Sequence, residues 1–343
     1  MILRFPVAFF KNFFYFCSME SISVKIVSRS EDLPQMTCRN FFHSAELFKM
    51  LEQTPGNSPY MVFVHDGNNR VLSHLLATIR RRGTFLFPFA YTQGRIYGEG
   101  EYEDDADKDE LFQLMLRAIT RKFVRKLCLY IEFSDLTSKM FGYRHFRQND
   151  YFPVRWMQIH NSLHSKTPRE RISNKLMRRI ENVYKAGIET REAVTDGEIS
   201  DFCKMLRNYY RFKVQRFIPR KQLFEHIGNS ENGKVYITQK KNKIIGGCAI
   251  VYSRNNAYLW YIASRRKSFA KLHPNLVTVW NALQTSYEKK LDHLYFMNVG
   301  LPFRRNIYRD FILRFGGKPV STYRWFRSSI GWVNKLLKWV YRE

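Results

Sequence analysis

Apolar and polar residues in the first 160 positions follow helix-like and strand-like patterns in turn. Apolar residues at helical spacing predict a short helix over residues 44–52 and a longer one over residues 110–126. Runs rich in β-branched and aromatic residues predict strands over residues 60–65, 71–80, 84–91 and 127–133. An acidic stretch separates the third strand from the longer helix, from Glu99 to Glu110. Strands followed by a helix and a further strand indicate an α+β unit.

The second half repeats this order. After a predicted helix at residues 198–212, apolar runs predict three strands at residues 235–238, 244–251 and 257–262, joined by short polar turns. Pro274 opens a predicted helix that continues to residue 289, and residues 294–298 form the closing strand. An antiparallel meander followed by a helix and a strand is again an α+β unit.

A well-capped helix is predicted between the two halves, over residues 167–187. Thr167 is a helix cap, Pro168 fits the first helical position, and Glu170 is placed to bond back to the cap. Gly187 suits the left-handed residue that ends a helix. Apolar residues occupy one face, and the opposite face carries Arg171, Lys175, Arg178 and Lys185. That basic face is either a solvated surface or an anion contact, and both interpretations stay open.

Charge is distributed very unevenly along the chain. The formal net charge is +27, and residues 161–343 carry 36 Lys and Arg against 13 Asp and Glu. Residues 1–160 carry 21 against 17. A positive surface of this size attracts nucleic acid, anionic lipid head groups or phosphorylated substrates. Charge alone does not choose among these partners.

Cysteine and histidine patterns predict no metal and no disulfide framework. The five cysteines are scattered without a Cys-x-x-Cys pair, which favours a reducing cytoplasm. His160 and His164 have the spacing of ligands on one helix face, but no Glu or Cys completes a known zinc pattern. We therefore interpret both as surface or packing histidines.

The N-terminal segment is treated as an extension, residues 1–19. It is apolar and aromatic, but Arg4 and Lys11 interrupt it and it is shorter than a spanning helix requires. A signal-like segment and a start site upstream of the true one, at Met19, are both compatible with it. We predict two domains after it, at residues 20–160 and 161–343, in a body that is soluble or peripheral to a membrane.

Several short motifs occur in an order that resembles a known family. They are Tyr130-Ile131-Glu132, the basic residues of 171–185, Ile245-Gly246-Gly247, Trp260-Tyr261, Pro274-Asn275, Phe296-Met297-Asn298-Val299-Gly300 and Phe315-Gly316-Gly317. The second half resembles a GNAT acyltransferase core, and residues 20–330 resemble the FemAB-type enzymes, which have two GNAT-like domains in tandem. The resemblance implies mixed sheets flanked by helices, with a degenerate, acceptor-facing first domain and a donor-binding second domain.

The resemblance also implies the chemistry. Such enzymes transfer an activated acyl or aminoacyl group to an amine, using aminoacyl-tRNA or acyl-CoA as donor substrate and no tightly bound cofactor. The fold has to align amine and carbonyl, remove a proton and stabilise an oxyanion. We expect the donor near Gly246 and Gly247, whose backbone can approach a ligand closely. Further donor-binding candidates are Tyr261, Arg265, Arg266, Lys267 and Asn275, the last of these at a helix N-terminus.

A second set of residues is expected to bind the acceptor or its phosphates. Its members are polar or basic residues, namely Glu132, Lys175, Arg178, Asn298, Arg304, Arg305, Tyr308 and Arg314. Glu132 has an alternative role that we favour, an ion pair with a neighbouring arginine. No catalytic residue is assigned. Where FemAB-like sequences usually have a Lys before the Phe-Gly-Gly turn, this chain has Ile312-Leu313-Arg314, which leaves a changed mechanism or lost activity open.

The sequence thus predicts a cytoplasmic acyltransferase that acts on a cell-envelope precursor, peptidoglycan-like or lipid. The Gly-rich phosphate loop of CoA-dependent GNAT enzymes is missing from residues 264–274, which favours tRNA as donor. A tail over residues 325–339 mixes apolar and basic residues, so it either lies at the inner membrane or packs on the body. The alternatives are an acyl-CoA-dependent N-acetyltransferase and a non-catalytic nucleic-acid or membrane-binding protein.

Overall fold

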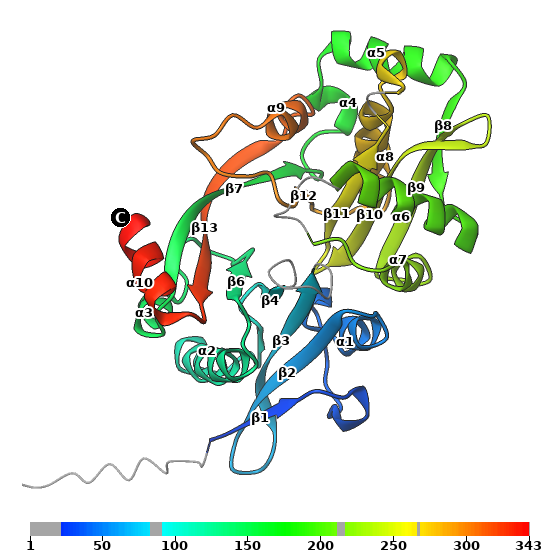
Figure 1. Cartoon of the computed structure of the whole chain (residues 1–343). Helices are drawn as coiled ribbons and strands as arrows, with labels where there is room; N and C mark the ends of the chain where they lie inside the picture. Colours follow the sequence, from blue (N-terminus) through cyan, green and yellow to red (C-terminus); the bar gives the residue numbers. More distant parts are fainter. Residues whose placement is uncertain (1–21, 83–90, 211–216, 266–267, 343) are drawn as a thin grey trace, which may run out of the picture.

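The computed structural model describes residues 22–82, 91–210, 217–265 and 268–342. Within these ranges the chain forms one mixed sheet of thirteen strands, with helices on both faces (Figure 1). The two predicted α+β units therefore share a continuous sheet. Among the described helices, none is long and apolar enough to cross a bilayer. The predicted extension at residues 1–19 lies outside the described residues.

The elements follow the chain in two similar series. The first half contains β1 (Ser23–Val27), η1 (Ser30–Asp32), η2 (Phe41–His43), α1 (Ala45–Glu52), β2 (Asn57–His65), β3 (Val71–Arg82), β4 (Tyr91–Tyr97), β5 (Glu101–Tyr102), α2 (Lys108–Arg125), β6 (Tyr130–Ser134), α3 (Tyr143–Gln148) and β7 (Phe152–Ser162). The second half contains α4 (Pro168–Arg171), α5 (Asn174–Lys185), β8 (Ile188–Glu192), α6 (Asp196–Tyr210), α7 (Lys221–Gly228), β9 (Gly233–Lys240), β10 (Lys243–Ser253), β11 (Asn256–Ser264), η3 (Ala270–Leu272), α8 (Pro274–Glu288), β12 (His293–Phe296), α9 (Ile307–Leu313), β13 (Lys318–Ser328) and α10 (Gly331–Val340).

Most predicted elements are confirmed, with two exceptions. The predicted strand at residues 84–91 falls almost wholly outside the described residues, and β4 begins only at Tyr91. The single helix predicted over residues 167–187 is wrong, because the chain there forms two helices, α4 and α5. Thr167 and Glu170 do form the expected capping box. Ile172 is extended, however, and the Ser173 side chain caps a new helix.

The strand order in the sheet is symmetrical about its centre. It runs β1-β2-β3-β4-β6-β13-β7-β12-β11-β10-β9-β8, and β5 pairs with β3 outside this path. Each strand of the first half thus has a counterpart in the second half at the same distance from the centre. The pairs β4–β6 and β11–β12 are both parallel, and the other neighbours are antiparallel.

The last strands of the two halves are exchanged (Figure 1). β7 pairs with β12 of the second half, and β13 pairs with β6 of the first half. β7 and β13 also pair with each other along nine residues, from Lys318 opposite His160 to Phe326 opposite Phe152. The predicted domain boundary after residue 160 lies inside β7, so a shared pair of strands connects the halves here.

The Phe-Gly-Gly turn directs the chain into β13. Gly316 has φ +80°, and a Cβ atom there would lie 2.8 Å from the Arg171 carbonyl oxygen. Phe315 is buried, and its carbonyl oxygen accepts a hydrogen bond of 2.6 Å from Asn161 Nδ2 on β7. The motif therefore has a packing role, because it sets β13 against β7.

Three apolar cores hold the layers together. α2 packs on β2 and β3 to form one core, and α5 and α8 cover β9, β10 and β11 to form another. The third core contains α1 from the first half together with α6 and α7 from the second. Because this core contains Phe42 and Trp260 side by side, its burial stabilises the two halves against each other.

Candidate functional site

The parallel strand pairs of the two halves end differently. In the first half, β4 and β6 stay paired from Gln93 opposite Tyr130 to Tyr97 opposite Ser134. In the second half, the β11–β12 ladder ends at Leu259 opposite Phe296, and β11 continues to Ser264. The register of β11 against β10 also shifts beside Trp260, between Leu259 and Tyr261. Such a bulge bends a strand and redirects its side chains. Because β12 ends at Phe296, β11 continues from Trp260 without β12 beside it.

Tyr97 and Trp260 meet at this point. They occupy corresponding register positions in β4 and β11, and the Trp260 indole Nε1 donates a hydrogen bond of 3.2 Å to the Tyr97 hydroxyl oxygen. Arg80 Nη2, from β3, lies 3.3 Å from the same oxygen. Tyr97 is thus held by one group from each half of the molecule. All three side chains are buried.

A small cavity of about 10 Å³, room for about one water molecule, lies beside these residues. Arg80, Arg95, Tyr97 and Trp260 form its polar wall, and its apolar wall includes Phe42, Leu47 and Leu76. The Nε atom of Arg80 is buried without a hydrogen-bond partner among the described residues. A buried polar donor usually has a partner, so this unpaired N–H is available to an anionic or carbonyl oxygen.

Electrostatics favour the ionised form of Tyr97. Burial alone would raise the pKa of its phenol, but Arg80 and Arg95 outweigh that effect and lower the pKa to about 8, with help from the Trp260 hydrogen bond. A group with a pKa close to neutral pH can take up and release a proton readily. Tyr97 is therefore a candidate general base for an incoming ammonium group.

Glu132 lies in a buried charge network beneath this pocket. It forms ion pairs with Arg95 and with Arg324 Nη1, the latter at 2.9 Å. Its second carboxylate oxygen accepts a hydrogen bond of 2.7 Å from Gln93 Nε2. Burial opposes ionisation of Glu132, but the two arginines hold its pKa below the usual range. The predicted alternative, an ion pair with a neighbouring arginine, is confirmed for Glu132, and both of its oxygens are engaged.

Arg324 extends the network to the loop after β12. Its Nη2 lies 3.0 Å from Asn298 Oδ1, and its guanidinium carbon lies 4.0 Å from the centre of the Trp156 ring. Asn298 has φ +62°, a conformation that Asn tolerates better than most residues. Arg324, on the last strand, contacts both Glu132 and Asn298. The structure thus brings these two predicted acceptor residues together.

The prediction that Gly246 and Gly247 leave backbone amides open for a donor is wrong. Both glycines are paired with β9 and with β11, so their amides are not left open for a donor. A Cβ atom on Gly246 would lie 2.8 Å from Thr278 Oγ1, and one on Gly247 would lie 2.7 Å from the Tyr236 carbonyl oxygen. The two glycines let helices and a neighbouring strand pack closely. A register shift does occur beside Gly246, where β10 pairs with β9, and a second one occurs at Trp260, where β11 pairs with β10.

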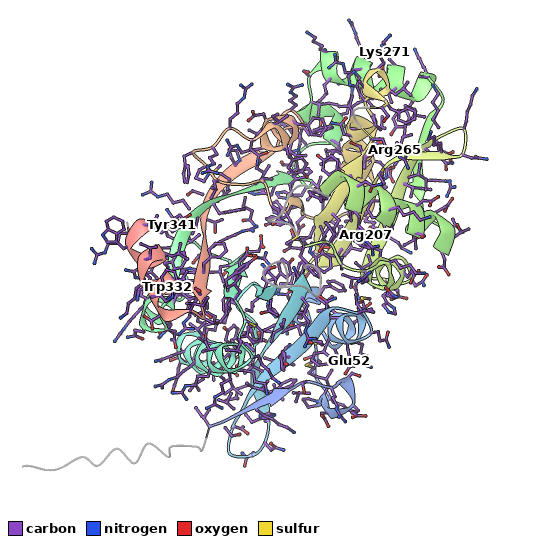
Figure 2. All side chains as sticks on the ribbon, viewed as in Figure 1. Glu52, Arg207, Arg265, Lys271, Trp332 and Tyr341 are labelled. Atoms are coloured by element: carbon purple, nitrogen blue, oxygen red, sulfur yellow. The ribbon has the colours of Figure 1, made fainter. Side chains whose placement is uncertain are left out.

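The other predicted donor residues are placed less centrally. The Tyr261 ring is buried against Phe224, with centroids 5.2 Å apart, so it belongs to the core and not to a ligand surface. Arg265 is exposed just after β11 (Figure 2), and Asn275 is half-buried in the first turn of α8. Arg266 and Lys267 lie outside the described residues.

The remaining basic candidates lie on two helices at the surface. Lys175 and Arg178 are exposed on α5, on the face opposite to the buried Leu176 and Ile180. The rest lie around α9, where Arg304, Arg305 and Arg314 are exposed and Tyr308 is half-buried. None of these residues lines the Tyr97 pocket, so the proposed acceptor set divides into separate groups among the described residues.

Sequence reasoning missed the residues that build the pocket. Arg80 and Arg95 lie inside strands among apolar neighbours, and an arginine in such a position is seldom buried without a partner. That pattern was the available signal. No such signal marked Tyr97 and Arg324, because the residues that they contact lie on strands that are distant in sequence.

Comparisons with known proteins agree with this architecture, and the fold is that of the tandem GNAT-like proteins. Residues 170–305 match the family described as Acetyltransferase (GNAT) domain. No curated protein matches the sequence.

Three solved structures share the fold over most of the chain. The crystal structure of FemX has a TM-score of 0.60 at 9% identity and covers 87% of this chain and 94% of its own. A tandem GNAT protein from the clavulanic acid biosynthesis pathway has a TM-score of 0.54 at 9% identity, covering 90% and 99%. The C-terminal domain of a putative lysylphosphatidylglycerol synthetase from Agrobacterium fabrum has a TM-score of 0.52 at 10% identity, covering 87% and 91%. At these identities the likeness establishes the fold, which the sequence motifs indicated.

Proposed function

We propose that this protein is an acyltransferase that moves an activated acyl or aminoacyl group onto an amine. The observation that carries the proposal is the position of Tyr97, which is held between Arg80 and Trp260 where β11 separates from β12. The donor carbonyl would enter between the separated strands. Tyr97 would take a proton from the acceptor ammonium, and the resulting amine would attack the donor carbonyl carbon while the free N–H of Arg80 stabilises the oxyanion. Collapse of the oxyanion would break the donor ester or thioester bond. The leaving hydroxyl or thiol would take the proton from Tyr97, and the new amide nitrogen would lose its remaining extra proton to water.

For the donor we propose aminoacyl-tRNA, with acyl-CoA as the alternative. Support comes from the charge of residues 161–343 and from the exposed Lys175, Arg178 and Arg265 on the second half. A long anionic donor can contact several dispersed cations, whereas a CoA pyrophosphate needs a compact loop.

For the acceptor we propose an amine-bearing precursor at an anionic membrane surface on the cytoplasmic side. α10 exposes Trp332 and Trp339, with 72% and 66% of their surface accessible, and Figure 2 shows Trp332 at the outer edge of the molecule. Lys335 and Arg342 add positive charge to the same segment. Indole rings beside cations suit the interface of an anionic bilayer.

The test compares both donors in one assay. Purified protein is incubated with vesicles containing cell-envelope lipids and either radiolabelled aminoacyl-tRNA or radiolabelled acetyl-CoA, and label in the lipid phase is measured. We expect transfer from aminoacyl-tRNA. Tyr97→Phe should lower the rate by about 10²–10⁴-fold, because the general base is lost, while salt-sensitive tRNA retention stays unchanged.

The outcomes separate the alternatives. Transfer only from acetyl-CoA would show that the donor is acyl-CoA and that the protein is still an acyltransferase. Equal rates for Tyr97→Phe and the unchanged protein would refute the assigned base. Retention of tRNA or vesicles without any transfer, from either donor, would leave a binding protein and overturn the proposal.

A further inference from the structure

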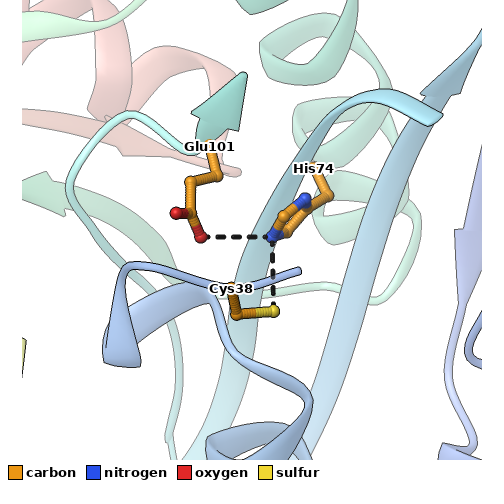
Figure 3. A group of neighbouring side chains, drawn as sticks. All are labelled: Cys38, His74 and Glu101. Carbon is orange, nitrogen blue, oxygen red and sulfur yellow. Dashed lines mark hydrogen bonds and ion pairs between the residues drawn. The ribbon is translucent and has the colours of Figure 1, made fainter. Parts of the chain in front are cut away.

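Three side chains with metal-binding chemistry converge on the far side of β3 from α2. They are Cys38, from the segment before η2, His74 of β3 and Glu101 of β5 (Figure 3). The sulfur of Cys38 lies 4.0 Å from His74 Nε2, and Glu101 Oε2 lies 3.5 Å from the same nitrogen. The three ligand atoms all lie within 4.8 Å of one another. None of these residues takes part in the Tyr97 pocket.

The geometry is that of a ligand set and not of a proton relay. In a catalytic Cys–His–carboxylate arrangement, the thiol and the carboxylate contact different nitrogens of the imidazole. Here both contact Nε2, so no proton can pass from Cys38 through the ring to Glu101. Ligands placed tetrahedrally around zinc lie roughly 3.3–3.8 Å apart, given bonds of about 2.0–2.3 Å. The observed separations need only a slight contraction to reach this range.

Glu101 supplies the second observation. Its Oε1 accepts hydrogen bonds from the backbone amides of Arg39 and Asn40, at 2.7 and 3.1 Å. Its Oε2 is buried, lies 3.5 Å from His74 Nε2 and accepts no hydrogen bond from any other described residue. Backbone donors that orient one carboxylate oxygen while the other faces the metal position are a common support for metal ligands.

We propose that Cys38, His74 and Glu101 bind one borderline-soft divalent cation, with Zn²⁺ as the expected ion. A thiolate, an imidazole and a carboxylate together select zinc over the oxygen-preferring Mg²⁺ and Ca²⁺. Cys38 is half-buried whereas His74 and Glu101 are buried, so the open side of the site lies beside the sulfur. A water molecule completes the tetrahedron there.

The ion would tie the two halves of the molecule together. Residues 38–41 connect the ligand Cys38 to the second half, because Ser253 Oγ of β10 accepts from the Phe41 amide at 3.0 Å and lies 3.0 Å from Asn40 Oδ1. Fixing Cys38 to β3 and β5 would hold this segment against β10. We therefore assign the site a structural role that is independent of acyl transfer.

The experiment uses the full chain, stripped with a chelator and titrated with Zn²⁺ and Co²⁺. We expect one ion per chain, a rise in melting temperature with Zn²⁺, and a thiolate-to-cobalt charge-transfer band. Cys38→Ala should abolish the band and weaken Zn²⁺ binding by at least about 10–100-fold. Cys203→Ala is the matched control, because Cys203 is a buried cysteine on α6 and is not one of the three ligands, so both signals should stay unchanged.

Glu101→Gln tests the site without removing sulfur. It should weaken Zn²⁺ binding while the apo protein still unfolds cooperatively, which separates a ligand from a folding residue. A cobalt band that survives Cys38→Ala would overturn the proposal. So would sub-stoichiometric binding, or a melting temperature that Zn²⁺ does not change.

Discussion

The two halves have the same strand order but use their parallel strand pair in different ways. In the first half, register opposes Arg95 to Glu132, and these charges lie in a buried network that closes the pair. At the corresponding position of the second half, Tyr258 opposes Tyr295, and their rings stack with centroids 5.0 Å apart. Two residues later, at Trp260, β11 bulges and no longer pairs with β12. The first half therefore acts as scaffold, and the second half opens the space that a donor would occupy.

This contrast shows how a duplicated fold can divide its tasks. A buried ion network is costly to disrupt, so it fixes the first half rigidly. In the proposed function, the donor enters beside Trp260. Tyr97, at the end of the closed pair, is then the group through which the first half contributes to the proposed chemistry.

Glu132→Ala should give the largest effect of these tests, a loss of stability caused in the first half. Removing this carboxylate leaves Arg95 and Arg324 buried without their common partner, so the free energy of unfolding should fall by about 3–5 kcal/mol. Chemical denaturation measures the loss. Glu31→Gln is the control, because Glu31 pairs with Arg29 at the surface and should change stability little.

A double variant checks that the loss comes from the uncompensated charge. Glu132→Gln combined with Arg324→Gln should recover part of the stability that Glu132→Gln alone loses. If the double variant is less stable than either single variant by the sum of both losses, the network is not a coupled unit and the scaffold interpretation of the first half is wrong.

The ionisation of Tyr97 should give the next largest effect. Its pKa of about 8 lies two units below the ordinary value of 10, about a hundredfold in the ionisation constant. The unfolded state binds more protons between pH 8 and 10, so the contribution of Tyr97 to stability grows with pH in that window and is lost as pH falls through 8. Turnover should rise with pH through the same value.

Phenolate absorbance measures this titration directly. One tyrosine should ionise near pH 8 in the folded protein, and Tyr97→Phe should remove that step. Tyr258 is the internal comparison, because burial raises the pKa of its phenol and no charge lowers it to that range. A first ionisation near pH 10 in the folded protein would refute the role of Tyr97 as base.

The smallest expected effect is on ligand binding by the exposed surfaces of the two halves. α10 contacts the first half, where Lys338 pairs with Asp150 at 2.7 Å, while α5 lies on the second. Trp332→Ser combined with Trp339→Ser should lower binding to anionic vesicles about tenfold, because two exposed indoles no longer enter the interface. Vesicle sedimentation measures this loss of binding.

The matched control for that test is Lys175→Gln combined with Arg178→Gln on α5. It should weaken retention of tRNA and leave vesicle binding nearly unchanged, because α5 exposes charge without large apolar residues. If both double variants weaken vesicle binding equally, attraction is by net charge alone and α10 has no special role.

The sequence by itself determined the local elements and their order. Periodic apolar residues placed α1, α2, α6 and α8, and strand runs placed β2, β3, β9, β10 and β11, because helical and extended chains bury side chains at different periods. The order of these elements, with the short motifs, was sufficient to indicate the tandem GNAT-like fold. β7 and β13 were not predicted, since Arg155, Gln158 and Arg324 interrupt their apolar residues with polar ones.

Only the tertiary structure decided which side chains meet at the candidate site. Exchange of β7 and β13 places Arg324 beside Glu132, which is 192 residues away in sequence, and the shared core places Trp260 against Tyr97, 163 residues away. Contacts over such separations depend on strand pairing and on the twist of the whole sheet, which local patterns do not encode. For the same reason Gly246 and Gly247 suggested a ligand site, whereas neighbouring helices and strands fill the space beside them.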